Sequence, residues 1–497
     1  MNKTKQRMLS LVLIIAALIG IVAACQKQSA QTTKTEGGQA VTTAAGGKDS
    51  IVIATMGETP TLSPYSHNAT AGSYMNLLTY STLFATDMDL NPQPELVESY
   101  ENESETRWVF HLKQGVKFHD GSEMTAQDVK ASLEYAKTFA EVSQFNNMIA
   151  SVEVVDDYTV AIETNGPSAV LLTNLCSHGN AIVPKKLIDE GHDFGEDPVG
   201  TGPYKLVEWK RGDSLTFEAF DEYFGGAPAI KHMTWKIIPE GSSRTIALEA
   251  GEVDFIVEVE AMDADRIQEN ENLELLSVDS TTLNWMVLNN EKPGLSNENV
   301  RRAINAAINK ENVITVAING LGKVAEGEGA SMLTGYSAEN TDSYDVEKAK
   351  EYMEKSGVKP SSVEMSIVCS NDTKKRAAEV IQADLKEIGI EAEIESMDLA
   401  TYLSATVEGD FTAAIGGSNQ ARFSDPEVDA LIDQASATVD EDARNELLQQ
   451  IMAKANQACP NIPLYTATSL RAYAKGLEGV EVNAGGTMRF EKCSWAD

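Results

Sequence analysis

The sequence predicts an α/β protein with two lobes, and two strand–helix–strand units carry this prediction. One unit occupies residues 233–257 and the other residues 363–394, so each half of the chain holds one. Strands joined through a helix in this way pair in parallel with a right-handed crossover. A chain of 497 residues also exceeds what one hydrophobic core supports. We therefore expect a separate α/β lobe around each unit.

The first unit begins with an apolar strand at residues 233–238. Ser242 or Ser243 should cap a short helix, because a hydroxyl oxygen can accept from the free N–H groups of the first turn. Gly251 should end that helix, and residues 253–257 should form the second strand.

The second unit alternates apolar and polar residues along a strand at 363–369. Asp372 or Thr373 should cap a helix whose apolar residues recur at helical spacing. Gly389 should end this helix, and residues 390–394 alternate again.

An antiparallel α+β insertion is predicted between the elements of the first lobe, over residues 83–182. Residues 107–112 alternate along a strand, and Asp156 lies in the turn of a predicted β-hairpin. Thr125 followed by Asp128 approximates a capping box at the start of a helix.

The N-terminus predicts export and lipid attachment. Three basic residues precede an apolar run at 8–21, and small residues at 22–24 stand directly before Cys25. This pattern looks like the lipobox of a bacterial lipoprotein, in which the cysteine becomes the new N-terminus and carries acyl chains such as palmitate. Two chains suffice for stable anchoring. The alternative is an uncleaved transmembrane anchor, but the apolar run is shorter than the ~20 residues a spanning helix needs.

A flexible tether should follow the lipid attachment site, since residues 25–49 are rich in Gln, Ser, Thr, Ala and Gly. The net charge of −35 excludes nucleic-acid binding, which requires a basic surface. We expect the acidic body to touch the membrane only through the anchor, on the outer face of a Gram-positive type of cell envelope.

No catalytic or metal-binding pattern is present. None of the six histidines has the spacing of a metalloprotease motif, Ser418 is not in a GxSxG elbow, and residues 320–323 lack the Lys-Ser/Thr pair of a phosphate-binding loop. We expect hydrogen-bonded structural roles for His111 and His119, and no enzyme activity, cofactor or metal.

The cysteines besides Cys25 match no zinc spacing. Cys369 shares a strand face with apolar residues, which indicates a buried thiol. In an exported protein, Cys459 and Cys493 are candidates for a disulfide, although four cysteines allow three pairings with Cys176 included.

Several stretches resemble the extracellular solute-binding proteins of ABC importers for peptides and nickel (family 5). They occur in the family's order from about residue 51 to the C-terminus. The stretches are residues 107–113, 115–121, 125–129, 200–204, 223–228, 299–304, 425–432 and 462–465. Their Gly and Pro residues also serve turns and close backbone contacts, so we use them as fold markers and not as ligand contacts.

The resemblance implies a two-lobed periplasmic-binding-protein-like type II fold with an additional α+β subdomain in the first lobe. Such proteins close on ligand by hinge motion. The expected division is a signal peptide at 1–24, a tether at 25–49, lobe I at 50–82, 183–280 and 466–497, the extra subdomain at 83–182, and lobe II at 281–465.

The ligand site of this fold lies between the lobes. In lobe I, the loop after the first strand supplies Tyr65, Ser66, His67 and Asn68 as candidate contacts. In lobe II the candidates are Gly417, Ser418 and Asn419, with Arg422 as the nearest cation for a ligand carboxylate.

The chain departs from peptide-binding relatives after the strand near residues 410–413. Those relatives carry a longer segment in which an acidic residue pairs with the ligand's α-ammonium group. Here residues 415–420 lead almost directly to residues 424–428, so that carboxylate cannot be carried over. We expect free dipeptides and tripeptides to bind weakly and ligands without a free amine to bind well.

The resemblance implies a monomeric receptor that delivers peptides or peptide-like solutes to ABC permease subunits. A nickel-chelate or haem receptor on the same fold is the alternative, suggested by His67 with Met56 and Met75. A surface enzyme or chaperone on this scaffold is a remote alternative, because no nucleophile–base pair is visible.

Overall fold

The computed structural model describes residues 48–67, 69–416 and 421–496. The predicted signal peptide, Cys25 and almost all of the tether lie outside these residues. So do four candidate ligand contacts: Asn68, Gly417, Ser418 and Asn419.

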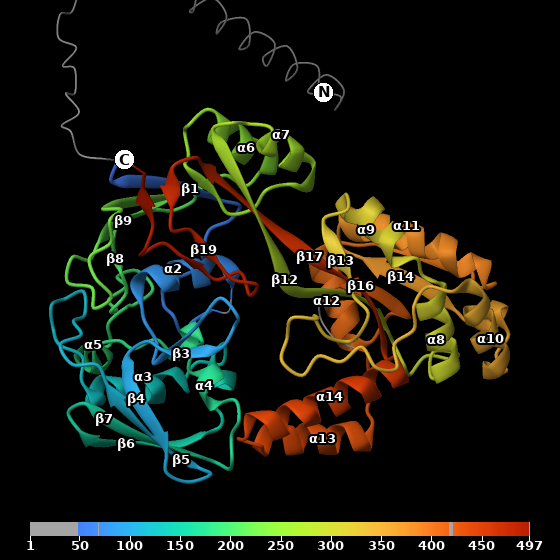
Figure 1. The fold of residues 1–497 in the computed structure, drawn as a ribbon, viewed down its shortest axis with the longest axis horizontal. Helices are drawn as coiled ribbons and strands as arrows, with labels where there is room; N and C mark the ends of the chain where they lie inside the picture. The colour runs from blue at the N-terminus through green and yellow to red at the C-terminus, as the bar shows by residue number, and fades with distance from the viewer. Residues whose placement is uncertain (1–47, 68, 417–420, 497) are drawn as a thin grey trace, which may run out of the picture. The chain divides into compact units, whose positions relative to one another are not determined.

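One large mixed sheet forms the framework of the described chain (Figure 1). Its strands, in spatial order, are β15 (Ala392–Ser396), β14 (Met365–Cys369), β16 (Ala413–Gly416), β12 (Leu273–Leu288), β17 (Asn461–Ala474), β11 (Phe255–Ile256), β1 (Ser50–Thr55), β10 (His232–Ile237), β9 (Ser214–Ala219) and β8 (Tyr204–Lys210). β13 (Gly322–Val324) pairs with β17 off this path.

The long strands β12 and β17 are common to both halves of this sheet. They pair in antiparallel fashion from Leu273 opposite Ala474 to Val287 opposite Asn461. β17 also pairs with β11 at one end, and β12 pairs with β16 at the other. The ladder between them shifts register after Asp279, so the pairing is interrupted near its middle.

Both predicted strand–helix–strand units are present, with parallel strands. α6 (Gly241–Glu249) follows β10 and leads to β11, and both of these strands pair in parallel with β1. α11 (Asp372–Glu387) joins β14 to its parallel neighbour β15. The predicted strand at 253–257 is shorter, because only two of its residues pair with β1.

The predicted caps of these two helices are wrong. The carboxylate of Glu240 accepts from the N–H groups of Ser242 and Ser243, and Asn371 caps α11 by accepting from the N–H of Lys374. In both cases another acceptor stands just before the predicted one. The helix therefore starts earlier, and the predicted capping residues lie in its first turn.

The predicted α+β insertion contains a four-stranded antiparallel sheet in the order β4–β5–β7–β6. These strands are β4 (Val97–Asn102), β5 (Arg107–Leu112), β7 (Thr159–Thr164) and β6 (Ile149–Asp156), and the last two form the predicted hairpin. α3 (Ala126–Ala136) packs against the sheet and begins with the predicted Thr125–Asp128 capping box (Figure 1).

The remaining elements are grouped by the lobe bounds predicted from the sequence, which stay a prediction. In the predicted lobe I and its insertion these are α2 (Thr70–Thr79), β2 (Phe84–Thr86), β3 (Pro92–Pro94), α4 (Leu171–Asn174), α5 (Lys185–Glu190), α7 (Ala264–Gln268), β18 (Leu477–Glu478), β19 (Glu481–Val482), β20 (Met488–Arg489) and β21 (Ser494–Trp495). In lobe II they are α8 (Glu298–Ala307), α9 (Lys310–Ile318), α10 (Val346–Ser356), α12 (Leu399–Glu408), α13 (Pro426–Ala437) and α14 (Glu441–Ala458). No helix among the described residues is both long and apolar enough to cross a bilayer.

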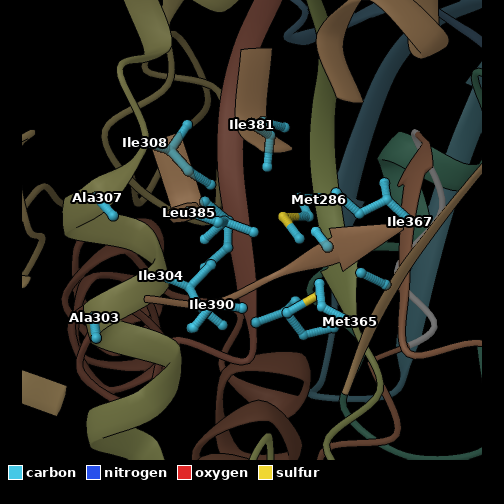
Figure 2. Packing of buried hydrophobic residues seen from close by; sticks show 14 of the residues in the cluster. Met286, Ala303, Ile304, Ala307, Ile308, Met365, Ile367, Ile381, Leu385 and Ile390 are labelled. Atoms are coloured by element: carbon cyan, nitrogen blue, oxygen red, sulfur yellow. The ribbon is translucent and has the colours of Figure 1, made fainter. Parts of the chain in front are cut away.

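The core of lobe II packs two helices against the mixed sheet. Figure 2 shows Ile304 of α8, Ile308 directly after α8, and Leu385 of α11 gathered around Met286 of β12 and Ile367 of β14. All five side chains are buried. Each such side chain contributes roughly 1.5–3 kcal/mol on transfer from water.

The four described cysteines are free thiols. Cys369 is buried, as predicted. The candidate disulfide between Cys459 and Cys493 is absent, because Cys459 belongs to the core of lobe II and Cys493 to a core of lobe I.

Candidate functional site

The loop after β1 places its predicted contacts in different environments. Tyr65 is fully buried, its hydroxyl donates to the Ala181 carbonyl over 2.7 Å, and its ring stacks on Phe139. Ser66 is exposed, and its hydroxyl donates to Ser63 Oγ over 3.2 Å. Tyr65 therefore supports the loop from within, while Ser66 faces solvent.

His67 lies beneath the first turn of α2. Its Nδ1 accepts from the Ala69 N–H over 3.2 Å, and its Nε2 hydrogen-bonds to the Asn76 side-chain amide over 3.1 Å. A Cβ at Gly72 would lie 2.2 Å from the ring, so only glycine permits this packing. Burial, then the nearby His178, lowers the pKa of His67 to about 4. The ring is therefore neutral at neutral pH.

His178 connects His67 to a cavity beside α2. The two rings stack with centroids 5.1 Å apart, and His178 Nε2 donates to the His67 carbonyl over 3.2 Å. Half-burial also lowers the pKa of His178. The sequence alone gave His178 no role, since it lies 111 residues from its partner.

The cavity beside α2 has a volume of about 440 Å³, which suits a small solute. Its wall mixes polar, aromatic and aliphatic side chains, and the described lining residues include no Asp, Glu, Lys or Arg. Among the lining residues are Ser73, Tyr74, Phe145, Asn174, His178 and Thr487. Such a wall can hold an uncharged part of a solute through hydrogen bonds and ring contacts, but it offers no partner for a formal charge.

The turn between β19 and β20 forms one side of this cavity. This turn was not identified as part of the site from the sequence alone. Asn483 fixes the turn, because its side chain donates to the Asp87 carbonyl and accepts from the Thr487 N–H. The Ala484 carbonyl accepts from the N–H of Thr281 over 3.0 Å. Thr281 lies in the stretch of β12 where the ladder with β17 is interrupted. The cavity wall is thereby joined to a strand shared by both halves of the sheet.

In lobe II, the chain makes a close contact at Gly416, the last residue of β16. A Cβ at this position would lie 2.3 Å from the hydroxyl of Tyr402 on α12, which donates to the Ile415 carbonyl over 3.0 Å. The missing side chain thus lets α12 lie directly against the end of this strand.

Arg422 does not lie near Gly416. The Ala421 carbonyl accepts from the Asn290 N–H, beyond the point where Leu288 pairs with Ala413 at the start of β16. The Arg422 guanidinium donates to the Val407 carbonyl at the end of α12. The structure therefore places Arg422 and Gly416 at opposite ends of β16.

The described residues include no group of three or more His, Cys, Asp or Glu side chains arranged to hold a metal ion. His119 is buried, and its Nε2 donates to the Gly202 carbonyl over 2.9 Å. This is the hydrogen-bonded structural histidine that the sequence predicted. Burial lowers its pKa to about 4.

Residues 91–434 match the family described as "Bacterial extracellular solute-binding proteins, family 5 Middle". The glutathione-binding protein GsiB of Salmonella paratyphi A is 28% identical over 469 residues, with 86% of this chain and 91% of that protein covered. Heme-binding protein A of Haemophilus influenzae is 27% identical over 515 residues, covering 91% and 93%. The solved structure of HbpA2 from Haemophilus parasuis superposes with a TM-score of 0.80 at 25% identity, covering 90% and 99%.

Proposed function

The chain belongs to the bacterial extracellular solute-binding proteins of family 5, and from this membership we propose that it captures peptides or peptide-like solutes for an ABC importer. The relative named for binding glutathione, itself a modified tripeptide, supports the peptide-like class. Delivery would be to the permease subunits of the importer. We propose that the receptor acts as a monomer without enzyme activity.

The observation that carries this proposal is the uncharged cavity beside α2 and its connection to β12. A solute in the cavity would touch the β19–β20 turn, which is hydrogen-bonded to β12 through Ala484 and Thr281. Strands β12 and β17 are where we propose that the chain passes between lobe I and lobe II, with the boundaries predicted from the sequence. Binding in the cavity can then bias a hinge motion about these strands.

We propose that the receptor is held on the outer face of the membrane by a lipid on Cys25, with residues 25–49 as its tether. The sequence around Cys25 supports this proposal. The strongly acidic body would be repelled by anionic lipid, since the full chain has a net charge of −35 even with the basic residues of its N-terminal segment included. Retention at the membrane would then depend on the acyl chains alone.

A haem or nickel-chelate receptor is the second candidate, favoured by the relative named for binding haem. The structure offers it less support. Both ring nitrogens of His67 already have hydrogen-bond partners, and His178 uses its Nε2 on the His67 carbonyl. Metal binding by His67 would have to replace its two ring hydrogen bonds, and His178 could offer only its Nδ1.

Isothermal titration calorimetry and thermal unfolding with a small panel test the proposal. The panel contains glutathione, a tripeptide, the same tripeptide N-acetylated, haem and a nickel–histidine complex. A ligand at a hundredfold excess over its Kd stabilises the folded state by about 2.7 kcal/mol. We expect stabilisation by a peptide-like compound, with the N-acetylated tripeptide bound more tightly than the free one. Binding of haem or nickel–histidine alone would favour the second candidate instead.

A further inference from the structure

The carboxyl ends of three parallel strands meet at one edge of lobe II. β14 pairs in parallel with β15 on one side and with β16 on the other. Ser370 follows β14, Ser396 ends β15 and Gly416 ends β16. In open α/β sheets, ligands bind outside the carboxyl ends of the strands. Side chains that reach over this edge are therefore placed to contact a solute.

Lys374 reaches over this edge from the first turn of α11. Its Nζ donates to Ser370 Oγ over 3.1 Å and lies 4.7 Å from the centroid of the Tyr402 ring. Tyr402 is itself fixed, because it is buried and its hydroxyl donates to the Ile415 carbonyl. The ammonium group is thus held between the end of β14 and the helix that packs against the end of β16.

The ammonium of Lys374 has no carboxylate partner in the described part of the chain, although acidic residues far outnumber basic ones. Two acidic residues at and just after the end of β15 have other hydrogen-bond partners: Glu395 accepts from Ser366 Oγ over 2.6 Å, and Asp398 accepts from Thr401. Lys374 is half-buried, so water only partly solvates its ammonium group, and this lowers its pKa. A half-buried, unpaired cation gains most from an anionic partner.

The cation predicted from the sequence, Arg422, does not have this position. It lies at the other end of β16, with its guanidinium donating to a backbone carbonyl. Among the described residues that line the cavity beside α2, none is charged. A charge on the solute must therefore be matched outside that cavity.

We propose that Lys374, with the Ser370 hydroxyl, binds an oxyanion of the solute, so that this receptor selects ligands with a carboxylate or a phosphate. The inference rests on the proposed function and specifies its ligand class. Lys374 is then a specificity-determining residue, and Tyr402 positions its ammonium group.

The test uses calorimetry on the purified protein with three probes: an N-acetylated tripeptide with a free carboxylate, its C-terminal amide, and inorganic phosphate. The amide is isosteric but uncharged, and the acetyl group removes the α-ammonium from the comparison. The variants are Lys374→Gln, Lys374→Arg and the control Lys375→Gln. The control removes the same charge one residue away, from a side chain that is exposed. Thermal unfolding of each variant reports whether it is folded.

We expect the wild type to prefer the free carboxylate over the amide by about tenfold to a hundredfold, the usual effect of a hydrogen bond to a charged group. Lys374→Gln should abolish this preference, while Lys374→Arg and Lys375→Gln should keep most of it. Binding of phosphate that depends on Lys374, without a carboxylate preference, would support the inference with phosphate as the anion.

Two outcomes would overturn the inference and can be told apart. If acid and amide bind the wild type equally, and phosphate does not bind through Lys374, the inference fails while the proposed function stands. The same holds if Lys374→Gln is folded and keeps its preference for the acid. If no probe of either panel binds, the proposed function fails and the inference fails with it.

Discussion

Replacing Gly72 by alanine is a sharp test of the site in lobe I, because helix propensity and packing predict opposite signs. Gly72 lies inside α2, where alanine normally stabilises a helix by about 1 kcal/mol over glycine. Here the new Cβ would lie 2.2 Å from His67 Cε1 and 2.5 Å from its Nε2. The ring must move, and it is confined by His178 on one face.

The expected cost follows from these contacts. Overpacking a buried site costs about 1–3 kcal/mol, and displacing the ring endangers two hydrogen bonds, to Ala69 and Asn76, of about 0.5–1.5 kcal/mol each. After the gain in helix propensity, Gly72→Ala should destabilise the protein by about 1–5 kcal/mol. Urea unfolding followed by circular dichroism measures this change.

The control is a double-mutant cycle with His67→Ala. Without the imidazole, the three atoms nearest to the new Cβ are removed, so Gly72→Ala should be neutral or stabilising by about 1 kcal/mol in that background. A stabilising effect of Gly72→Ala in the wild type would refute the packing of His67 described above. Equal destabilisation in both backgrounds would place the clash on some other group.

Three further predictions concern attachment, the hinge and pH. Cys25→Ala should release the protein from the membrane fraction, because we propose no other anchor; full retention in the pellet would contradict the lipid attachment. Thr281→Pro removes the N–H that donates to Ala484, so hydrogen exchange in the β19–β20 turn should accelerate by about two- to tenfold; unchanged exchange would show that this bond does not hold the turn. The pKa of His67 is about 4 in the folded protein against about 6.5 when unfolded, so the unfolded chain takes up the proton first. The contribution of the neutral His67 ring to the free energy of unfolding is therefore complete above pH 6.5 and is lost as the pH falls through 4. His67→Gln should flatten the dependence of the urea midpoint between these values, and an unaltered slope would count against the burial of the ring.

Local sequence patterns predicted which segments form helices and strands, but they did not predict the residues that cap the helices. The alternation at residues 107–112 and the unit at 363–394 appear in the structure as predicted, because strand and helix periodicity is a local property. Caps depend on which of several neighbouring acceptors is used, and here Glu240 and Asn371 take the place of the predicted residues. The disulfide candidate was wrong because spacing carries no information on which core a cysteine joins.

The candidate site was predicted only in part, because its contacts join segments far apart in sequence. His67 was identified from its loop, but its stacking on His178 has no local signature. The sequence predicted Arg422 as the cation nearest to a ligand carboxylate beside residues 417–419; this stays a prediction, because those three residues lie outside the described part of the chain. Lys374 could be recognised as a candidate ligand contact only from the structure, because the order of the strands places the ends of β14 and β16 side by side.

Small-angle X-ray scattering of the purified protein, with and without the tightest ligand of the calorimetric panel, tests the central claim most directly. If the chain is a solute-binding receptor that closes about β12 and β17, a saturating peptide-like ligand should reduce the radius of gyration. A ligand verified as saturating by calorimetry, with a radius of gyration that stays unchanged, would contradict closure about these strands.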